Sequence, residues 1–121
     1  MQVPLYALLL APDDNERRAV ESGQKTITIR KGHRDYRVGY AVMICCHIEP
    51  WCVMADISSV VHCTLEEVTE EELRDDGFTD HADMIAQLGR FYPDISLTSQ
   101  VTVIRWVDVR GKLVDAQQTK D

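Results

Sequence analysis

The chain has 121 residues, of which 45% are hydrophobic and 27% are charged, and its formal net charge is -7. This size corresponds to one domain, and this composition excludes a disordered or a fibrous chain. The acidic balance argues against a surface that binds a nucleic-acid backbone over a long stretch, because such binding depends on Lys and Arg.

The longest strongly apolar stretch near the start runs from Leu5 to Ala11. It is far shorter than the roughly 20 residues that a membrane-spanning helix needs, and no basic segment precedes it. We therefore expect no membrane association and a cytoplasmic location. The cysteines lie in apolar, strand-like segments, which favours reduced, buried thiols over a disulfide framework. They are Cys45, Cys46, Cys52 and Cys63.

In chain order, the first predicted elements are a short buried strand at 6–10 and a helix. Residues 12–14, Pro-Asp-Asp, are typical of the start of a helix, and Gly23 is typical of its end. Residues 25–30 then alternate as a strand does, with Ile27 and Ile29 on one face. The other face carries Thr26, Thr28 and Arg30.

The middle of the chain predicts more strands and one or two short helices. An apolar run at 40–48 has the length of a strand, and 51–57 and 60–63 continue the sheet. Thr-x-x-Glu capping boxes at 64–67 and 69–72 indicate the starts of one or two short helices, and Gly77 ends them.

A second helix and a last strand complete the chain. Thr79 is the predicted cap of a helix that ends at 91–93, and its inward stripe consists of Met84, Ile85 and Leu88. Residues 101–109 alternate as a strand. We expect an α+β domain over 1–113, a small, partly closed mixed β-barrel with short helices, and a flexible tail over 114–121.

Residues 23–30, Gly-Gln-Lys-Thr-Ile-Thr-Ile-Arg, place an amine, two hydroxyls and a guanidinium in one short segment. In a structural interpretation these are β-forming threonines and exposed strand ends. The spacing Gly-x-Lys-x-x-Thr-x-Arg also resembles the signature of the ASCH family, whose domains have a PUA-like barrel. The later order, with Asp76-Gly77-Phe78, Tyr92-Pro93 and a closing strand, resembles that family over most of 4–109.

The string Lys-Thr-Ile-Thr-Ile-Arg resembles, within that family, the small bacterial amidohydrolases that deacetylate N4-acetylcytidine. The resemblance implies Thr28 as nucleophile, Lys25 as its activator and a carboxylic acid as proton donor, with no metal or organic cofactor. That acid falls at Asp76, where the family has Glu, and Asp75 and Glu72 are alternatives.

The chemistry of these roles sets conditions on the fold. A threonine hydroxyl needs a base to take its proton, and a lysine can serve only as a neutral, partly desolvated amine. Strict alternation places Lys25 on the strand face opposite Thr28, so the two can meet only if Lys25 lies in a turn or a bulge before the strand.

The basic segment between Arg30 and Arg37 is the predicted place for the rest of a ligand. Thr26 and Arg30, on the face of Thr28, are predicted substrate contacts, and Arg34 and Arg37 are candidates for binding ribose or phosphate. His33 and Tyr36 are candidates for stacking on a base. A solvated loop without a ligand is the alternative.

Cysteines and histidines in this chain also suggest zinc, but no Cys-x-x-Cys or His-x-x-x-His spacing is present. The residues concerned are Cys45, Cys46, His47, Cys52, His62 and Cys63. We therefore predict no metal site and interpret the thiols, like Trp51 and Trp106, as core residues.

Three functions remain open at this point. The first is an amidohydrolase that acts on a small modified nucleoside, which Thr28 and the acidic net charge favour. The second is a module that binds a nucleotide or RNA without chemistry, or a ribonuclease, as PUA-like domains allow. The third is an acidic helical surface at 66–83 that binds a partner protein.

Overall fold

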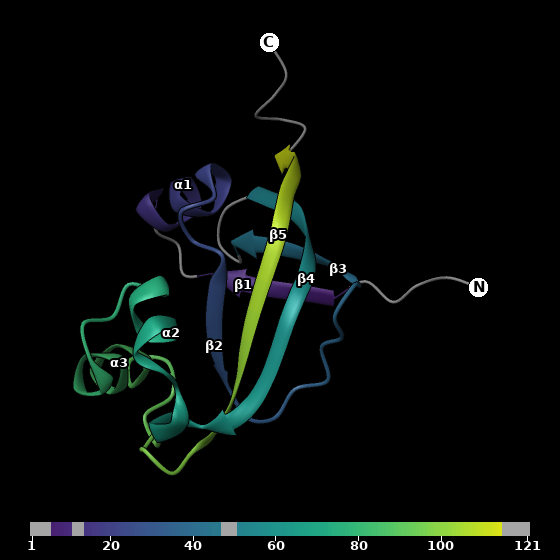
Figure 1. The fold of residues 1–121 in the computed structure, drawn as a ribbon. Coiled ribbons are helices and arrows are strands. Elements are labelled where there is room, and N and C mark those ends of the chain that lie inside the picture. The colour runs from purple at the N-terminus through teal and green to yellow at the C-terminus, as the bar shows by residue number, and fades with distance from the viewer. Residues whose placement is uncertain (1–5, 11–13, 47–50, 115–121) are drawn as a thin grey trace.

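The computed structural model describes residues 6–10, 14–46 and 51–114 (Figure 1). Its elements, in chain order, are β1 (Tyr6–Leu10), α1 (Asp14–Ser22), β2 (Ile27–Lys31), β3 (Ala41–Cys46), β4 (Trp51–Thr64), the 3-10 turn η1 (Leu65–Glu67), α2 (Glu70–Asp75), α3 (His81–Leu88) and β5 (Gln100–Val114). No described helix is long and apolar enough to span a membrane.

The strands form one five-stranded sheet in the order β1-β3-β4-β5-β2. Only β1 and β3 are parallel, and the other neighbours are antiparallel. The α+β class is as predicted. The predicted partly closed barrel is wrong, because β1 and β2 are the two edges of the sheet and do not pair with each other.

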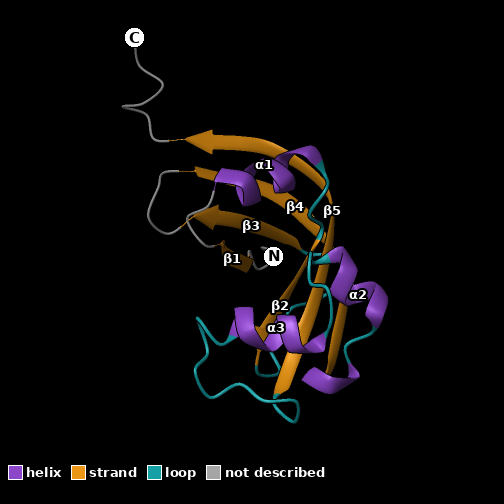
Figure 2. Cartoon of the chain, turned by 90° about the vertical axis from the view of Figure 1, so that its left-hand side faces the viewer, coloured by secondary structure: helices purple, strands orange, loops and turns teal. Residues whose placement is uncertain are grey.

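Helices cover the sheet at two places (Figures 1 and 2). α1 lies over one end of the sheet, and α2 and α3 lie beside β2 at the other. Each place has its own core. The core under α1 contains Leu8, Val20, Val42, Ile44, Trp51, Val53, Ala55, Ile57, Ile104 and Trp106, and the core under α2 and α3 contains Ile27, Ile29, Leu65, Val68, Leu73, Met84, Leu88, Ile95, Val101 and Val103.

The two cores lie on opposite faces of the β2–β5 pair. Ile27 and Ile29 belong to the core under α2, as does Val103, the partner of Ile29. Thr28 pairs with Ile104, which belongs to the core under α1. The predicted alternation of β2 is therefore confirmed, and Thr28 lies on the face of the core that contains Trp106.

The long strands β4 and β5 differ from their predicted lengths. β4 is one strand rather than two, because irregularities in its pairing with β5 between Cys52 and Ser59 bend it without ending it. β5 continues to Val114, so its ladder enters the predicted tail. The rest of that tail, 115–121, lies outside the described residues.

The helix starts follow local hydrogen bonds. Thr69 and Glu72 form the predicted capping box at α2, and the Glu67 carboxylate accepts a hydrogen bond from the Thr64 N–H at η1. The prediction that Thr79 caps α3 is wrong by one residue. Asp80 is the cap, because its carboxylate accepts the N–H of residue 83.

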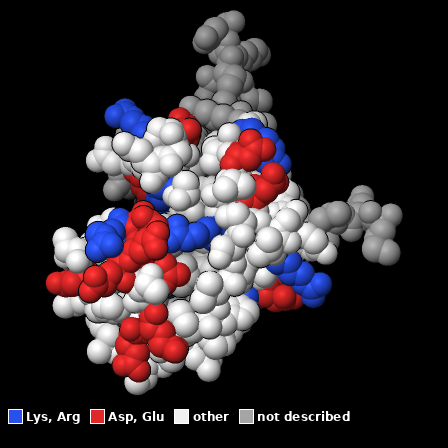
Figure 3. Space-filling view, viewed as in Figure 1, with Lys and Arg blue, Asp and Glu red and all other residues white. Residues whose placement is uncertain are grey.

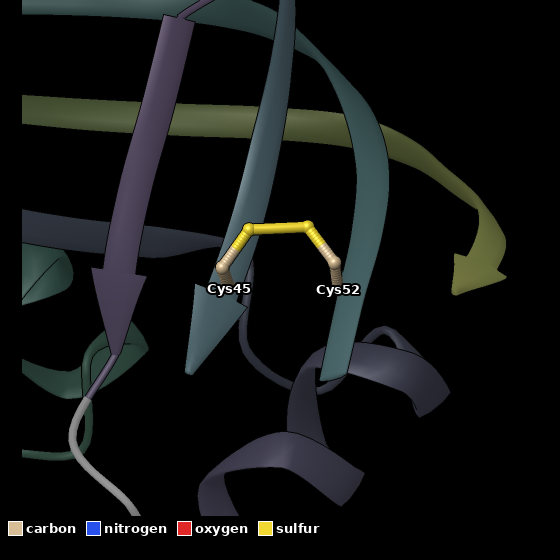
Figure 4. The surroundings of a disulfide bond; sticks show 2 residues. All are labelled: Cys45 and Cys52. Atoms are coloured by element: carbon tan, nitrogen blue, oxygen red, sulfur yellow. A yellow bond between two sulfur atoms is a disulfide. The ribbon is translucent and has the colours of Figure 1, made fainter. Parts of the chain in front are cut away.

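The prediction of reduced thiols is wrong for Cys45 and Cys52, which form a disulfide (Figure 4). They lie directly opposite each other on β3 and β4, with their Cα atoms 4.2 Å apart. Directly opposite positions on neighbouring strands bring the two cysteine side chains together. Cys63 is free and half-buried, and burial raises the pKa of its thiol, as do the charges of Glu72 and Glu67.

Candidate functional site

Lys25 contacts Asp76 across 51 residues of sequence. The Lys25 Nζ donates a hydrogen bond to the Asp76 carboxylate, and their side chains are only 12% and 6% exposed. The contact joins the segment after α1 to the end of α2. Two sequence-predicted residues therefore meet in a buried ion pair.

Lys25 precedes β2 rather than lying in it, since β2 begins at Ile27. Its backbone N–H donates to the Ala19 carbonyl of α1 at 2.9 Å, so the chain at Lys25 still follows the end of that helix. The condition that strand alternation imposes is thereby met. Lys25 lies in the turn before the strand, so strand alternation does not place its side chain on the face opposite Thr28.

Asp76 is oriented by the way in which α2 ends. The N–H of Phe78 donates to the Leu73 carbonyl, and that of Gly77 donates to the Arg74 carbonyl. This is a Schellman motif, which needs a left-handed residue after the cap, and Gly77 has a φ of 91°. Phe78 then packs on the core that holds Leu73, which anchors the turn.

The two alternative acids have other partners. The Asp75 carboxylate accepts a hydrogen bond from Arg105 at 2.8 Å, and the Glu72 carboxylate accepts one from the backbone N–H of Thr69. Among the three acids considered from the sequence, Asp76 is the one that contacts Lys25. The shorter reach of Asp, compared with the family Glu, does not prevent this contact.

Thr28 is buried, at 6% exposure, and its Oγ1 accepts a hydrogen bond from Arg30 Nε at 3.2 Å. Arg30 also acts on Asp76, because its positive charge opposes the protonation of that carboxyl. Among the described residues, no hydrogen bond joins Thr28 to Lys25. Arg30 therefore acts on both groups, on the Thr28 hydroxyl through a hydrogen bond and on Asp76 through its charge.

The electrostatics of the site are dominated by burial. Burial raises the pKa of the Asp76 carboxyl above its usual value, and the ammonium of Lys25 opposes that rise. The charge of Glu16 raises the Asp76 pKa further. A carboxyl in this environment keeps its proton to higher pH than an exposed aspartate does.

Glu16 is a member of this cluster that the sequence analysis missed. Its Oε1 is 3.4 Å from Lys25 Nζ, and its side chain is 30% exposed. The available signal was its position, four residues before the buried Val20 and therefore on the inward face of α1. An acid on an apolar helix face needs a partner.

The basic loop after β2 is held by the sheet rather than by the ion pair. The hydroxyl of Thr102, fully buried, donates to the Gly32 carbonyl and accepts the Arg34 N–H. The Arg34 side chain bonds the Lys31 carbonyl, and Arg37 pairs with Asp35. Neither arginine contacts Lys25 or Thr28 in these bonds.

Three further residues that were predicted to contact a ligand have these contacts within the chain. His33 stacks on His62, with ring centroids 5.0 Å apart. The Tyr36 hydroxyl donates to the Ala7 carbonyl, and its ring packs on the core under α1. The backbone N–H of Trp106 donates a hydrogen bond to the backbone carbonyl of Thr26 at 3.0 Å.

Metal ligands and surface charge add little to the site. Over the part of the chain that the structure describes, no three His, Cys, Asp or Glu side chains gather as a metal site needs, and His47 lies outside that part. Acidic side chains gather over α2 and the segments beside it, with basic side chains flanking them (Figure 3).

The comparisons with known proteins concern the fold. No family model and no curated protein matches the chain. Among solved structures, an ASCH domain from Lactobacillus crispatus JV V101 is 15% identical with a TM-score of 0.60, covering 84% of this chain and 77% of that one. ASCH from Zymomonas mobilis is 15% identical with a TM-score of 0.64, covering 93% and 75%.

A third structure extends the similarity. A protein from Enterococcus faecalis V583 is 12% identical with a TM-score of 0.59, covering 91% of this chain and 85% of that chain. The resemblance drawn from the Lys25-to-Arg30 segment is confirmed at the level of the fold: this chain has the fold of the ASCH domains.

Proposed function

We propose that this protein is a metal-independent amidohydrolase that removes the acetyl group from N4-acetylcytidine or a related modified nucleoside. The observation that carries the proposal is the buried contact of Lys25 with Asp76, together with Arg30, which donates a hydrogen bond to Thr28 and whose charge acts on Asp76. Burial of an ion pair is costly and is typical of sites where charge has a chemical task.

The pair contains both proton states that the reaction needs. Lys25 and Asp76 share one proton, which lies on the amine in the ion pair and on the carboxyl in the neutral pair. Burial raises the pKa of Asp76, which favours its carboxylic acid form. In the proposed reaction Asp76 acts from that form as the acid, and Lys25 acts as the base that takes the proton of Thr28.

The first step forms an acyl-enzyme. Thr28 Oγ1 attacks the acetyl carbonyl carbon while its proton passes to Lys25 Nζ. The C–N bond then breaks, and the departing N4 amine takes the proton of Asp76, so cytidine leaves. The hydrogen bond from Arg30 Nε stabilises negative charge on Oγ1. The pair is now ammonium and carboxylate.

The second step restores the pair. A water molecule attacks the ester carbonyl and gives its proton to the Asp76 carboxylate, while Lys25 returns a proton to the Thr28 oxygen as the ester bond breaks. Acetic acid leaves and ionises in water. No cofactor enters the balance. Thr26 and Arg30 are the proposed contacts to the base, and Arg34 and Arg37 those to the ribose.

The test is to incubate the purified protein with N4-acetylcytidine and follow cytidine and acetate by chromatography, with and without a chelator. We expect chelator-resistant release, lost in Lys25→Ala and Thr28→Ala and lowered in Asp76→Asn. Full activity in either alanine variant would overturn these roles, and no release at high protein concentration would overturn the substrate.

A second candidate function is the binding of a nucleotide or an RNA end without chemistry. What favours it is the exposure of Arg37, at 62% of its side chain, in a loop that also carries Arg34. The test is the anisotropy of a labelled oligonucleotide with the protein and with its Arg34→Ala, Arg37→Ala variant. Salt-sensitive binding that the variant loses, without cytidine release, would select this function.

A further inference from the structure

The amine of Lys25 lies between two carboxylates that come from different helices. Asp76, at the end of α2, is its nearer partner, and Glu16, in the first turns of α1, is 3.4 Å away. The two differ in environment, because the Asp76 side chain is 6% exposed and that of Glu16 is 30% exposed. One carboxylate is therefore buried, and the other reaches water.

We propose that Glu16 is a positioning residue of the site, whose negative charge holds the Lys25 amine against Asp76 and keeps the shared proton within that pair as the pH rises. This inference rests on the proposed function for its catalytic meaning. Its electrostatic part concerns the pair of Lys25 and Asp76 and holds whatever the substrate is.

The charges around Asp76 determine the direction of the effect. Those that act on it are Lys25 before β2, Glu16 on α1 and Arg30 on β2. Arg105 of β5 is bonded to the neighbouring Asp75. The two cations favour the ionised carboxyl, and Glu16 is the charge that opposes them. Without Glu16, Asp76 loses its proton at lower pH.

This has a consequence for catalysis. The first step needs Asp76 protonated and Lys25 neutral. In this state the one proton that the two residues share lies on the Asp76 carboxyl. Once solvent removes that proton, no acid remains for the departing amine, and the rate falls on the alkaline side. Glu16 therefore extends the working range upward without touching the substrate.

The experiment compares the wild-type protein with Glu16→Gln, which keeps the shape and removes the charge. The first readout is the titration of the Asp76 carboxyl carbon by NMR, which needs no substrate. We expect its midpoint to fall by about one unit, as a charge a few ångströms away produces in a partly hydrated site. Glu71→Gln, the same change at an exposed position of α2, is the control.

The second readout is the pH profile of kcat/KM for N4-acetylcytidine. We expect the alkaline limb to move down by the same amount in Glu16→Gln and to return toward the wild type in Glu16→Asp. An unchanged Asp76 midpoint would overturn the proposal, as would a turnover lowered equally at every pH. If the wild-type protein releases no cytidine, the proposed function fails and the NMR titration still decides the role of Glu16.

Discussion

The buried ion pair and the basic loop hold their charges in different ways. Lys25 and Asp76 lie between α1 and α2 with little exposure, and they are fixed by the end of one helix and the Schellman turn of the other. Arg37 and Asp35 pair at 3.5 Å with 62% and 81% of their side chains exposed. Burial distinguishes the two regions more than the number of charges does.

This difference indicates which charges are placed for chemistry. A buried charge requires a partner at a fixed position, and removing that partner is costly, whereas an exposed pair contributes little to stability. Reaction requires groups with fixed positions and altered proton affinity. Encounter with a ligand requires neither. Variants in the buried site should therefore change turnover and stability more than variants in the exposed loop do.

The largest expected effect is on turnover in Thr28→Val. Valine keeps the shape of the buried threonine and removes the hydroxyl, so we expect the release of cytidine to fall by at least about 1,000-fold. Stability should change by only about 1 kcal/mol, because the hydrogen bond from Arg30 is lost. Thr28→Ser, which keeps a hydroxyl, should retain measurable turnover. Equal rates in the valine variant and the wild type would exclude Thr28 as nucleophile.

The second prediction compares stability in the two regions. Lys25→Met removes the partner of the buried Asp76 carboxyl and should lower the free energy of unfolding by about 2 kcal/mol, because the carboxyl is left without its hydrogen-bond partner. Arg37→Met in the exposed pair should cost less than about 0.5 kcal/mol. Urea unfolding at pH 7 measures both. Similar losses would show that burial does not separate the regions.

The sequence predicted the parts of this site that depend on local pattern. Alternation placed Thr28 and Arg30 on one face of β2, and the string Asp-Gly-Phe marked the turn that carries Asp76. It did not predict Glu16, because contact between α1 and the residue after that helix depends on how the helix packs. The open sheet was also missed, since the pairing of strands far apart in sequence decides it. The Cys45–Cys52 disulfide was missed because the pairing register of β3 and β4, which places the two cysteines opposite each other, was not predicted.

The third prediction concerns the turn that carries Asp76. Gly77 has a φ of 91°, which a residue with a Cβ adopts only at a cost, although no atom lies within 4 Å of the added Cβ. We expect Gly77→Ala to lower stability by about 1 kcal/mol. Turnover should fall as well, because the Schellman turn orients the Asp76 carboxyl. Gly39→Ala, also at positive φ but in the turn between the basic segment and β3, should show the stability loss without the loss of turnover.

The smallest expected effect is in the pH dependence of stability, and Asp76→Asn isolates it. Burial raises the pKa of Asp76 in the folded chain above the unfolded value of about 3.9, so the folded state binds the extra proton between those two pKa values. Its stabilising contribution is present below pH about 4 and is lost as the pH rises through the folded pKa. The wild type should therefore lose stability relative to Asp76→Asn over that window.

Urea unfolding of both chains between pH 4 and pH 8 measures this difference. Glu67 and Asp83 do not disturb it, because their pKa values, lowered by hydrogen bonds from the backbone of Thr64 and Thr79, change both chains alike. A wild type that instead gains stability over Asp76→Asn with rising pH would mean that Lys25 lowers the Asp76 pKa more than burial raises it. The resting site would then be an ion pair, and Asp76 could not supply the proton that the departing amine needs.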